Sequence, residues 1–182
     1  MIRFFLIFTL IFLTIVEQGQ AQTPVSKETA NTYYQNCKAQ PDPRFSGKSQ
    51  EMFCACTAVK MTESYTMEDM RAASQQNQTG RDATNKLIIN VYAPCIQYPA
   101  REYHYTSCKN NPQTSILGGN AEKICQCASQ KAAEYLQQNA ASLFQDILSK
   151  NPNITDPMQA LYDDPAFQTV MKSKLSGCLI GL

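Results

Sequence analysis

The sequence predicts an all-α protein built as a tandem duplication of a small helical module that disulfide bonds hold together. Three observations predict this fold class. The 182 residues include eight cysteines, the cysteine spacing C-x16-C-x-C followed by a lone cysteine occurs twice, and apolar residues recur at helical intervals without convincing strand alternation. We therefore expect two similar halves, each of about four helices.

The duplication is read from the cysteine spacing. A shift of 71 positions superposes residues 33–64 on 104–135 without a gap, and ten of the 32 positions are then identical. The matches include Pro and Gly, which punctuate backbone geometry. We expect a first repeat at 22–99 and a second at 100–182. Their cysteines are Cys37, Cys54, Cys56 and Cys95, then Cys108, Cys125, Cys127 and Cys178.

Residues 1–21 have the pattern of a secretory signal peptide. Arg3 precedes an apolar run from Phe4 to Val16, and Gly19-Gln20-Ala21 supplies the small residues that a signal peptidase reads. The run is shorter than the ~20 residues of a membrane-spanning helix. We expect cleavage after Ala21, a periplasmic or secreted protein without a stable membrane anchor, and, in that oxidising compartment, four disulfides.

Helix signals follow in order along each half. In the first half we expect helices at 26–39 and from about residue 48, a short third helix opened by a capping box at 66–69, a polar break at 75–82, and a fourth helix at 83–93 that Pro94 ends. In the second half we expect a long helix at 121–150 that Asn151-Pro152 ends. Asp164-Pro165 opens the last helix.

The repeated C-x-C motif predicts how the helices are joined. Residues two apart on an α-helix point about 200° apart, so Cys54 and Cys56 should bond to different neighbouring helices, as should Cys125 and Cys127. Two pairings in each half satisfy this condition, and the spacing does not choose between them. We expect all eight cysteines to be structural, at ~2–4 kcal/mol per bridge.

Composition and motifs argue against several functions. A net charge of +1 speaks against nucleic-acid binding, and one histidine with no nucleophile-elbow glycines leaves no catalytic residue to name. His104 aligns with Tyr33, which indicates aromatic packing. We expect no enzyme activity, no cofactor and no metal. Two alternatives are less favoured. Thiol redox chemistry usually needs C-x-x-C, and this chain has C-x-C. Soft-metal binding would use sulfur ligands whose methionines the second half does not repeat: Met52, Cys54, Cys56, Met61, Met67 and Met70.

The remaining features point to a binding protein. Charged pairs three residues apart occur in both halves, and tyrosines flank the junction, so the expected interaction surface comprises Lys60, Glu63, Lys131, Glu134, Tyr98 and Tyr103. The predicted function is an exported, non-enzymatic helical protein with a protein partner, of the inhibitor, immunity or secretion-accessory type. The alternative is a carrier of a lipid or other apolar ligand, with a cavity lined by Leu87, Ile88, Val91, Tyr92, Leu143, Phe144, Ile147 and Leu148. Asn77 and Asn153 lie in glycosylation sequons, which matter only in a eukaryotic host.

Overall fold

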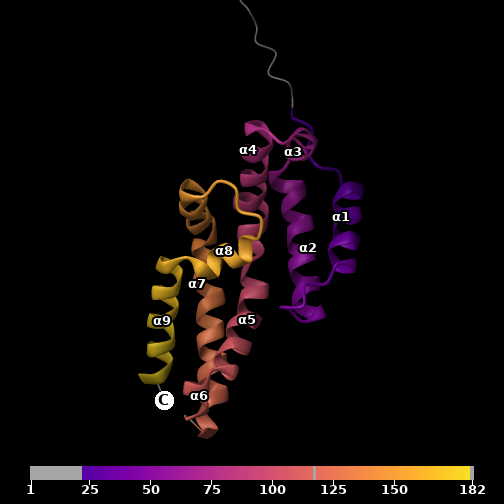
Figure 1. Ribbon diagram of the computed structural model, residues 1–182. Helices are drawn as coiled ribbons and strands as arrows, with labels where there is room; N and C mark the ends of the chain where they lie inside the picture. The colour runs from indigo at the N-terminus through magenta and orange to yellow at the C-terminus, as the bar shows by residue number, and fades with distance from the viewer. Residues whose placement is uncertain (1–21, 117, 181–182) are drawn as a thin grey trace, which may run out of the picture.

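The computed structural model describes residues 22–116 and 118–180, and within them the chain is helical (Figure 1). The only β feature of these residues is an isolated bridge between Pro24 and Thr66. The α-helices are α1 (Lys27–Ala39), α2 (Gly47–Ser64), α3 (Met67–Ala73), α4 (Gln78–Leu87), α5 (Gln97–Asn110), α6 (Pro112–Ser115), α7 (Ala121–Lys150), α8 (Pro157–Asp163) and α9 (Pro165–Ile180). The expected signal peptide at 1–21 lies outside the described residues. No helix in the described part is both long and apolar enough to cross a membrane.

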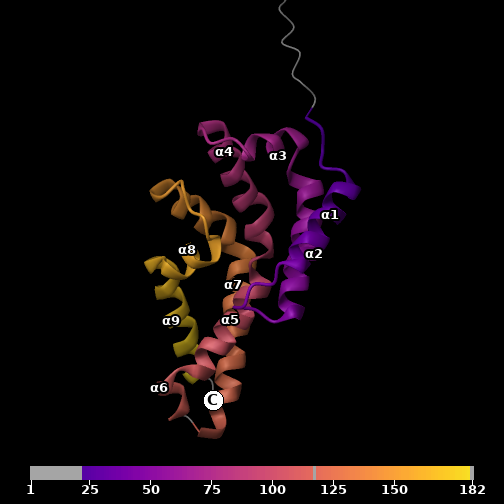
Figure 2. The same ribbon diagram turned by 45° about the vertical axis from the view of Figure 1, so that its right-hand side comes forward.

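The long helices stand side by side in a row. Both views place α1 and α9 at opposite ends of this row, with α2, the continuous α4–α5 rod and α7 between them (Figures 1 and 2). Helix α1 packs on α2, α5 packs on α7, and α7 packs on α9. The chain passes from α4 into α5 through a π-helical turn (Ile88–Tyr92) and a 3-10 turn (Ala93–Cys95), so one rod belongs to both halves.

Side-chain caps explain where several helices begin. Ser26 accepts a hydrogen bond from the backbone N–H of Thr29 at 3.1 Å, which starts α1 at the predicted place. Thr66 and Asp69 form the predicted capping box of α3, with each side chain accepting from the other residue's backbone N–H. Asp156 caps α8, a helix that was not predicted separately.

The fourth helix differs from its prediction at both ends. The polar segment 75–82 is not a break throughout, because Asn77 accepts a hydrogen bond from the N–H of Gly80 at 3.0 Å and starts α4 at Gln78. Pro94 does not end the rod, because it falls in the first positions of a new 3-10 turn, where a missing N–H leaves no hydrogen bond unmade.

Two apolar cores hold the row together. The smaller one lies within the first half and contains Val25, Ala30, Ala58, Met61, Tyr65 and Val91. The larger one crosses the predicted boundary between residues 99 and 100, and contains Ile88, Ala93, Ile96, Ala100, Leu136, Ala140, Phe144, Ile147, Leu148, Met158, Leu161 and Phe167. The end of the first half is therefore part of the hydrophobic core of the second.

Candidate functional site

All eight cysteines are paired, and the pairing is the same in both halves. In the first half Cys37 bonds to Cys54 and Cys56 bonds to Cys95. In the second half Cys108 bonds to Cys125 and Cys127 bonds to Cys178. Each C-x-C motif therefore ties its helix to two different neighbours: α2 to α1 and to the 3-10 turn after α4, and α7 to α5 and α9.

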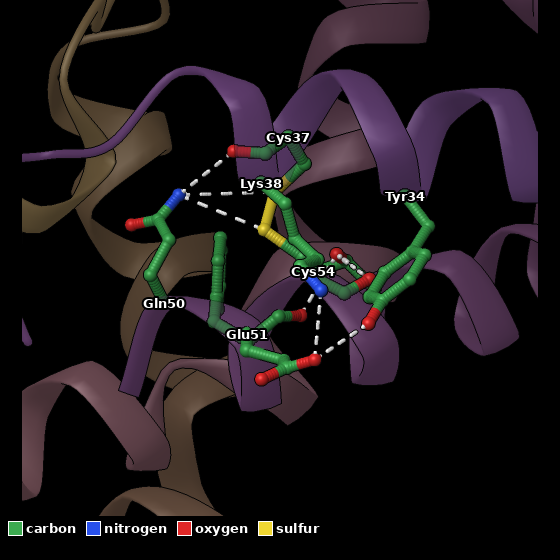
Figure 3. The surroundings of a disulfide bond; sticks show 8 residues. Tyr34, Cys37, Lys38, Gln50, Glu51 and Cys54 are labelled. Carbon is green, nitrogen blue, oxygen red and sulfur yellow. Dashed lines mark hydrogen bonds and ion pairs between the residues drawn. A yellow bond between two sulfur atoms is a disulfide. The ribbon is translucent and has the colours of Figure 1, made fainter. Parts of the chain in front are cut away.

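A tyrosine, a glutamate and a lysine surround the first disulfide of the first half (Figure 3). The Tyr34 hydroxyl donates to Glu51 at 2.9 Å, and Lys38 Nζ donates to the same carboxylate oxygen at 2.8 Å. Gln50 Nε2 also donates to the carbonyl of Cys37 at 3.2 Å. The hydrogen bonds from Lys38 and Tyr34 hold the pKa of Glu51 below its usual value, so the contact stays charged at neutral pH.

The second half contains the same cluster 71 positions later. Tyr105 donates to Glu122, and Lys109 Nζ donates to the other oxygen of this carboxylate at 2.9 Å. Each lysine also lies over its tyrosine ring, with Lys38 5.0 Å and Lys109 5.5 Å from the ring centroid. The positions that the sequence shift matches therefore have matching contacts, and these contacts fix α1 on α2 and α5 on α7.

A groove of about 640 Å³ lies where the first half meets the second. We call it the junction groove. The beginning of α2 forms one wall, and α5 and α7 form the rest, with the lining residues Ser46, Lys48, Ser49, Met52, Tyr98, Arg101, Glu102, Tyr105, Gln126 and Ser129. Ser49 Oγ donates to the carbonyl of Tyr98 at 3.0 Å and joins the walls. The side chain of Met52 is 43 % exposed at the rim.

The junction groove continues into a smaller hollow of about 130 Å³. Met52, Tyr98 and Arg101 line both, and the smaller hollow adds Glu134 and the amide side chains of Gln97, Gln130 and Gln137. Amides offer both hydrogen-bond donors and acceptors. The combined surface therefore presents an apolar rim, two tyrosines and several groups that can hydrogen-bond to a polypeptide backbone.

A counterpart of the junction groove exists in the first half. A hollow of about 370 Å³ between α1 and α2 is lined by Lys27, Ala30, Asn31, Tyr34, Ala55, Ala58, Val59 and Thr62. The first six of these residues lie 71 positions before residues of the junction groove. Ala30 stands where the junction groove has Arg101, and Ala55 stands where it has Gln126. The two grooves occupy positions that the shift of 71 residues matches, and they differ in chemistry.

The structure brings together only part of the predicted interaction surface. Tyr98 and Glu134 line the same small hollow beside the junction groove. Lys60 and Glu63 form their predicted ion pair at 2.7 Å, but the corresponding Lys131–Glu134 pair is not among the ion pairs of the described residues. Glu134 instead accepts a hydrogen bond from Gln130 at 3.0 Å.

Tyr103 belongs to a separate aromatic cluster. Its ring stacks on Tyr162 with centroids 4.0 Å apart, and His104 lies 5.2 Å from Tyr162 and 5.7 Å from Phe167. His104 thus packs among aromatic rings, as its alignment with Tyr33 predicts. Burial lowers the pKa of His104 to about 4, so this imidazole is neutral at pH 7.

The predicted carrier lining is mostly packed protein interior. Ile88, Phe144, Ile147 and Leu148 are buried members of the larger core, and Val91 belongs to the smaller one. A hollow of about 400 Å³ lies elsewhere, between the loop before α2 and the start of α8, and Tyr92 is the one predicted lining residue that borders it.

The proposed soft-metal set is dispersed in the structure. Cys54 and Cys56 are in disulfides, Met61 is buried in the smaller core, and Met52 lies at the junction groove. Met67 and Met70 pack against the smaller core. In residues 22–116 and 118–180, no group of three or more His, Cys, Asp or Glu side chains is placed to hold a metal ion.

The groove residues Lys48, Met52 and Arg101 are absent from the predicted interaction surface, and Met52 is named only in the soft-metal set. The shift of 71 positions contains a signal for the two charged residues, because it sets Arg101 against Ala30 and Lys48 against Gly119, and a charge present in only one of two matched positions has no shared structural role to explain it. Met52, which the shift sets against Lys123, gives no such signal, since its contribution depends on α2 of one half reaching α5 of the other.

The fold and the groove define a disulfide-stabilised, all-helical protein with an open hollow where its two halves meet. Comparison with protein-family models, with curated proteins and with solved structures found no match to this chain.

Proposed function

We propose that this chain is an exported, non-enzymatic binding protein that holds a protein partner in the junction groove. The observation that carries the proposal is the groove itself, with an exposed methionine, two tyrosines and hydrogen-bonding side chains on a wall that two disulfide-linked helix pairs support. Exposed apolar and aromatic side chains with a polar surround are typical of protein interfaces. The groove belongs to an inhibitor, immunity or secretion-accessory type of protein.

Export is part of the same proposal. Four disulfides are consistent with an extracellular or otherwise oxidising compartment. The pattern of residues 1–21 supports a signal peptide that is removed after Ala21 and leaves a periplasmic or secreted protein. A rigid scaffold also favours binding, because a surface that is already ordered loses little conformational entropy when a partner docks.

We also infer that the chain arose by tandem duplication of one helical module. Three observations support this origin: the repeated cysteine spacing, the same pairing of cysteines in both halves, and the Tyr–Glu–Lys cluster at matched positions. In this view the junction groove was created when the beginning of α2 came to lie against the second copy.

Two groove variants and one matched control variant test the binding function. The mature protein, bearing an affinity tag, is incubated with the exported fraction of its host, and the retained proteins are identified by mass spectrometry. Met52→Ala and Tyr98→Ala should lose the partner that the wild type retains, whereas Val59→Ala, which removes an exposed apolar side chain from the same helix as Met52, should keep it. Equal capture by all variants, or no specific capture by the wild type, would contradict the proposal.

The second candidate function is a carrier, and the hollow of about 400 Å³ favours it. Phe45, Phe53, Tyr92, Ile96 and Met158 give this hollow an apolar interior, while Arg44, Asp42 and Asp156 are also among its lining residues. Such a cavity suits a ligand with an apolar body and a polar head. Native mass spectrometry should then detect a co-purified ligand, and Tyr92→Trp should displace it. Absence of any ligand together with no binding of a fluorescent fatty acid would reject the carrier.

A further inference from the structure

Two cationic side chains in the junction groove have no partner among the residues that the structure describes. Lys48 and Arg101 line the groove and form no hydrogen bond or ion pair with the residues that the structure describes. Two other lysines form ion pairs within the protein: Lys38 pairs with Glu51 at 2.8 Å, and Lys109 pairs with Glu122 at 2.9 Å. The positive charges of the groove are therefore available to a ligand.

The one carboxylate among the residues lining the groove already accepts hydrogen bonds within the protein. Glu102 accepts hydrogen bonds from the backbone N–H of Ser46 at 2.9 Å and from its hydroxyl at 2.8 Å. Ser46 is the N-cap of α2, where the helix dipole is positive, so the negative charge of Glu102 is balanced there. Lys48 and Arg101 are then the charged side chains of the groove lining that have no partner among the described residues.

The surroundings of these cations select the kind of anion. Met52, Tyr98 and Tyr105 offer apolar and aromatic area, which a compact inorganic anion would leave uncovered. The net charge of +1 gives no basic stripe to hold a polyanion such as a nucleic acid. A polypeptide that alternates acidic and apolar side chains matches both the cations and the apolar rim.

We propose that the junction groove binds an acidic, extended segment of the partner protein, with its carboxylates on Lys48 and Arg101 and an apolar side chain against Met52. This inference rests on the proposed binding function and names the chemistry of the segment that the groove recognises. The counterpart groove of the first half has Ala30 in place of Arg101, so the same segment should not bind there.

The test uses isotopically labelled mature protein and three short synthetic peptides, in which leucine alternates with glutamate, glutamine or lysine. In NMR titrations, the glutamate peptide should shift resonances of residues around Lys48 and Arg101 and should bind more weakly at high salt. Lys48→Gln and Arg101→Gln should each weaken binding about fivefold, as expected for an exposed charged contact of ~1 kcal/mol. Lys172→Gln, an exposed lysine on α9 that does not line the groove, is the control and should leave the affinity unchanged.

Three results would overturn this inference: equal binding of the glutamine peptide, shifts that map to the counterpart groove, or saturation of the groove by anionic phospholipid vesicles without any binding of the glutamate peptide. The capture experiment separates this failure from failure of the binding function. If Met52→Ala loses the partner while Lys48→Gln and Arg101→Gln retain it, the partner uses the groove but its segment is not acidic. If none of these substitutions matters, the groove is not the binding site.

Discussion

We expect the single histidine to make the stability of this protein sensitive to mild acid. His104 lies among aromatic rings, and its Nε2 atom is buried without a hydrogen-bond partner in the described residues. A protonated imidazole would place a positive charge there without compensation, which is why burial lowers the pKa from 6.5 to about 4. The unfolded chain accepts the proton at the ordinary value.

The sign and size of the effect follow from the two pKa values. Between pH 6.5 and pH 4 the imidazole of His104 binds a proton in the unfolded state but not in the folded state, so the free energy of unfolding falls as the pH falls. Relative to pH 7 the loss is about 2 kcal/mol at pH 5 and about 3 kcal/mol at pH 4. The pKa values of Asp42 and Asp69 are lowered, so the stability that these carboxylates confer is lost only in stronger acid.

The assay is urea unfolding of the wild type and of His104→Phe at several pH values between 5 and 7. Because the chain has no other histidine, the variant should lose most of the pH dependence in this interval while keeping a ring among its aromatic neighbours. Two results would refute the reasoning: a wild type whose unfolding free energy is flat from pH 7 to pH 5, or a variant as acid-sensitive as the wild type.

Three further predictions concern stability. Gly80→Ala should destabilise the protein by several kcal/mol, because its Cβ would lie 1.9 Å from a backbone oxygen, whereas Gly47→Ala, which meets nothing within 4 Å, should be neutral or stabilising in thermal melts. Replacing Cys127 and Cys178 together by Ala should cost about 4 kcal/mol in denaturant unfolding, since their bridge closes a long loop, and a cost near zero would show that the unfolded chain is not constrained. Tyr162→Phe should raise the melting temperature, because it removes a buried hydroxyl without a partner among the described residues, and a clear loss would reveal a partner.

Helix content and the cross-linked plan could be predicted from the sequence because both depend on local spacing. The C-x-C geometry determines that Cys54 and Cys56 face different neighbours, and a short polar sequence such as Thr66 to Asp69 contains its own cap. The choice between the two allowed pairings could not be made, since it depends on which helix packs on which side.

The groove could not be predicted for a related reason. Met52 and Arg101 are distant in sequence, and they line the same groove only because α2 contacts α5. The prediction of a break at 75–82 was wrong for a local reason. Asn77 caps α4 within this run of polar residues, so the helix begins before the run ends. Glu134 likewise accepts a hydrogen bond from Gln130, four residues before it, and not from Lys131, three residues before it. Both spacings place side chains next to each other on a helix, so the sequence does not decide between them.

The covalent bonds and the hydrophobic core divide this chain at different places. Every disulfide closes within residues 37–95 or within residues 108–178, but the larger core takes Ile88, Ala93 and Ile96 from one side and its other members from beyond residue 99. We therefore expect each half to keep its own bridges when the other is reduced, but both halves to unfold together in heat or denaturant. Expressed alone, the second half would lack Ile88, Ala93 and Ile96 of its core, and the first half would expose them to solvent.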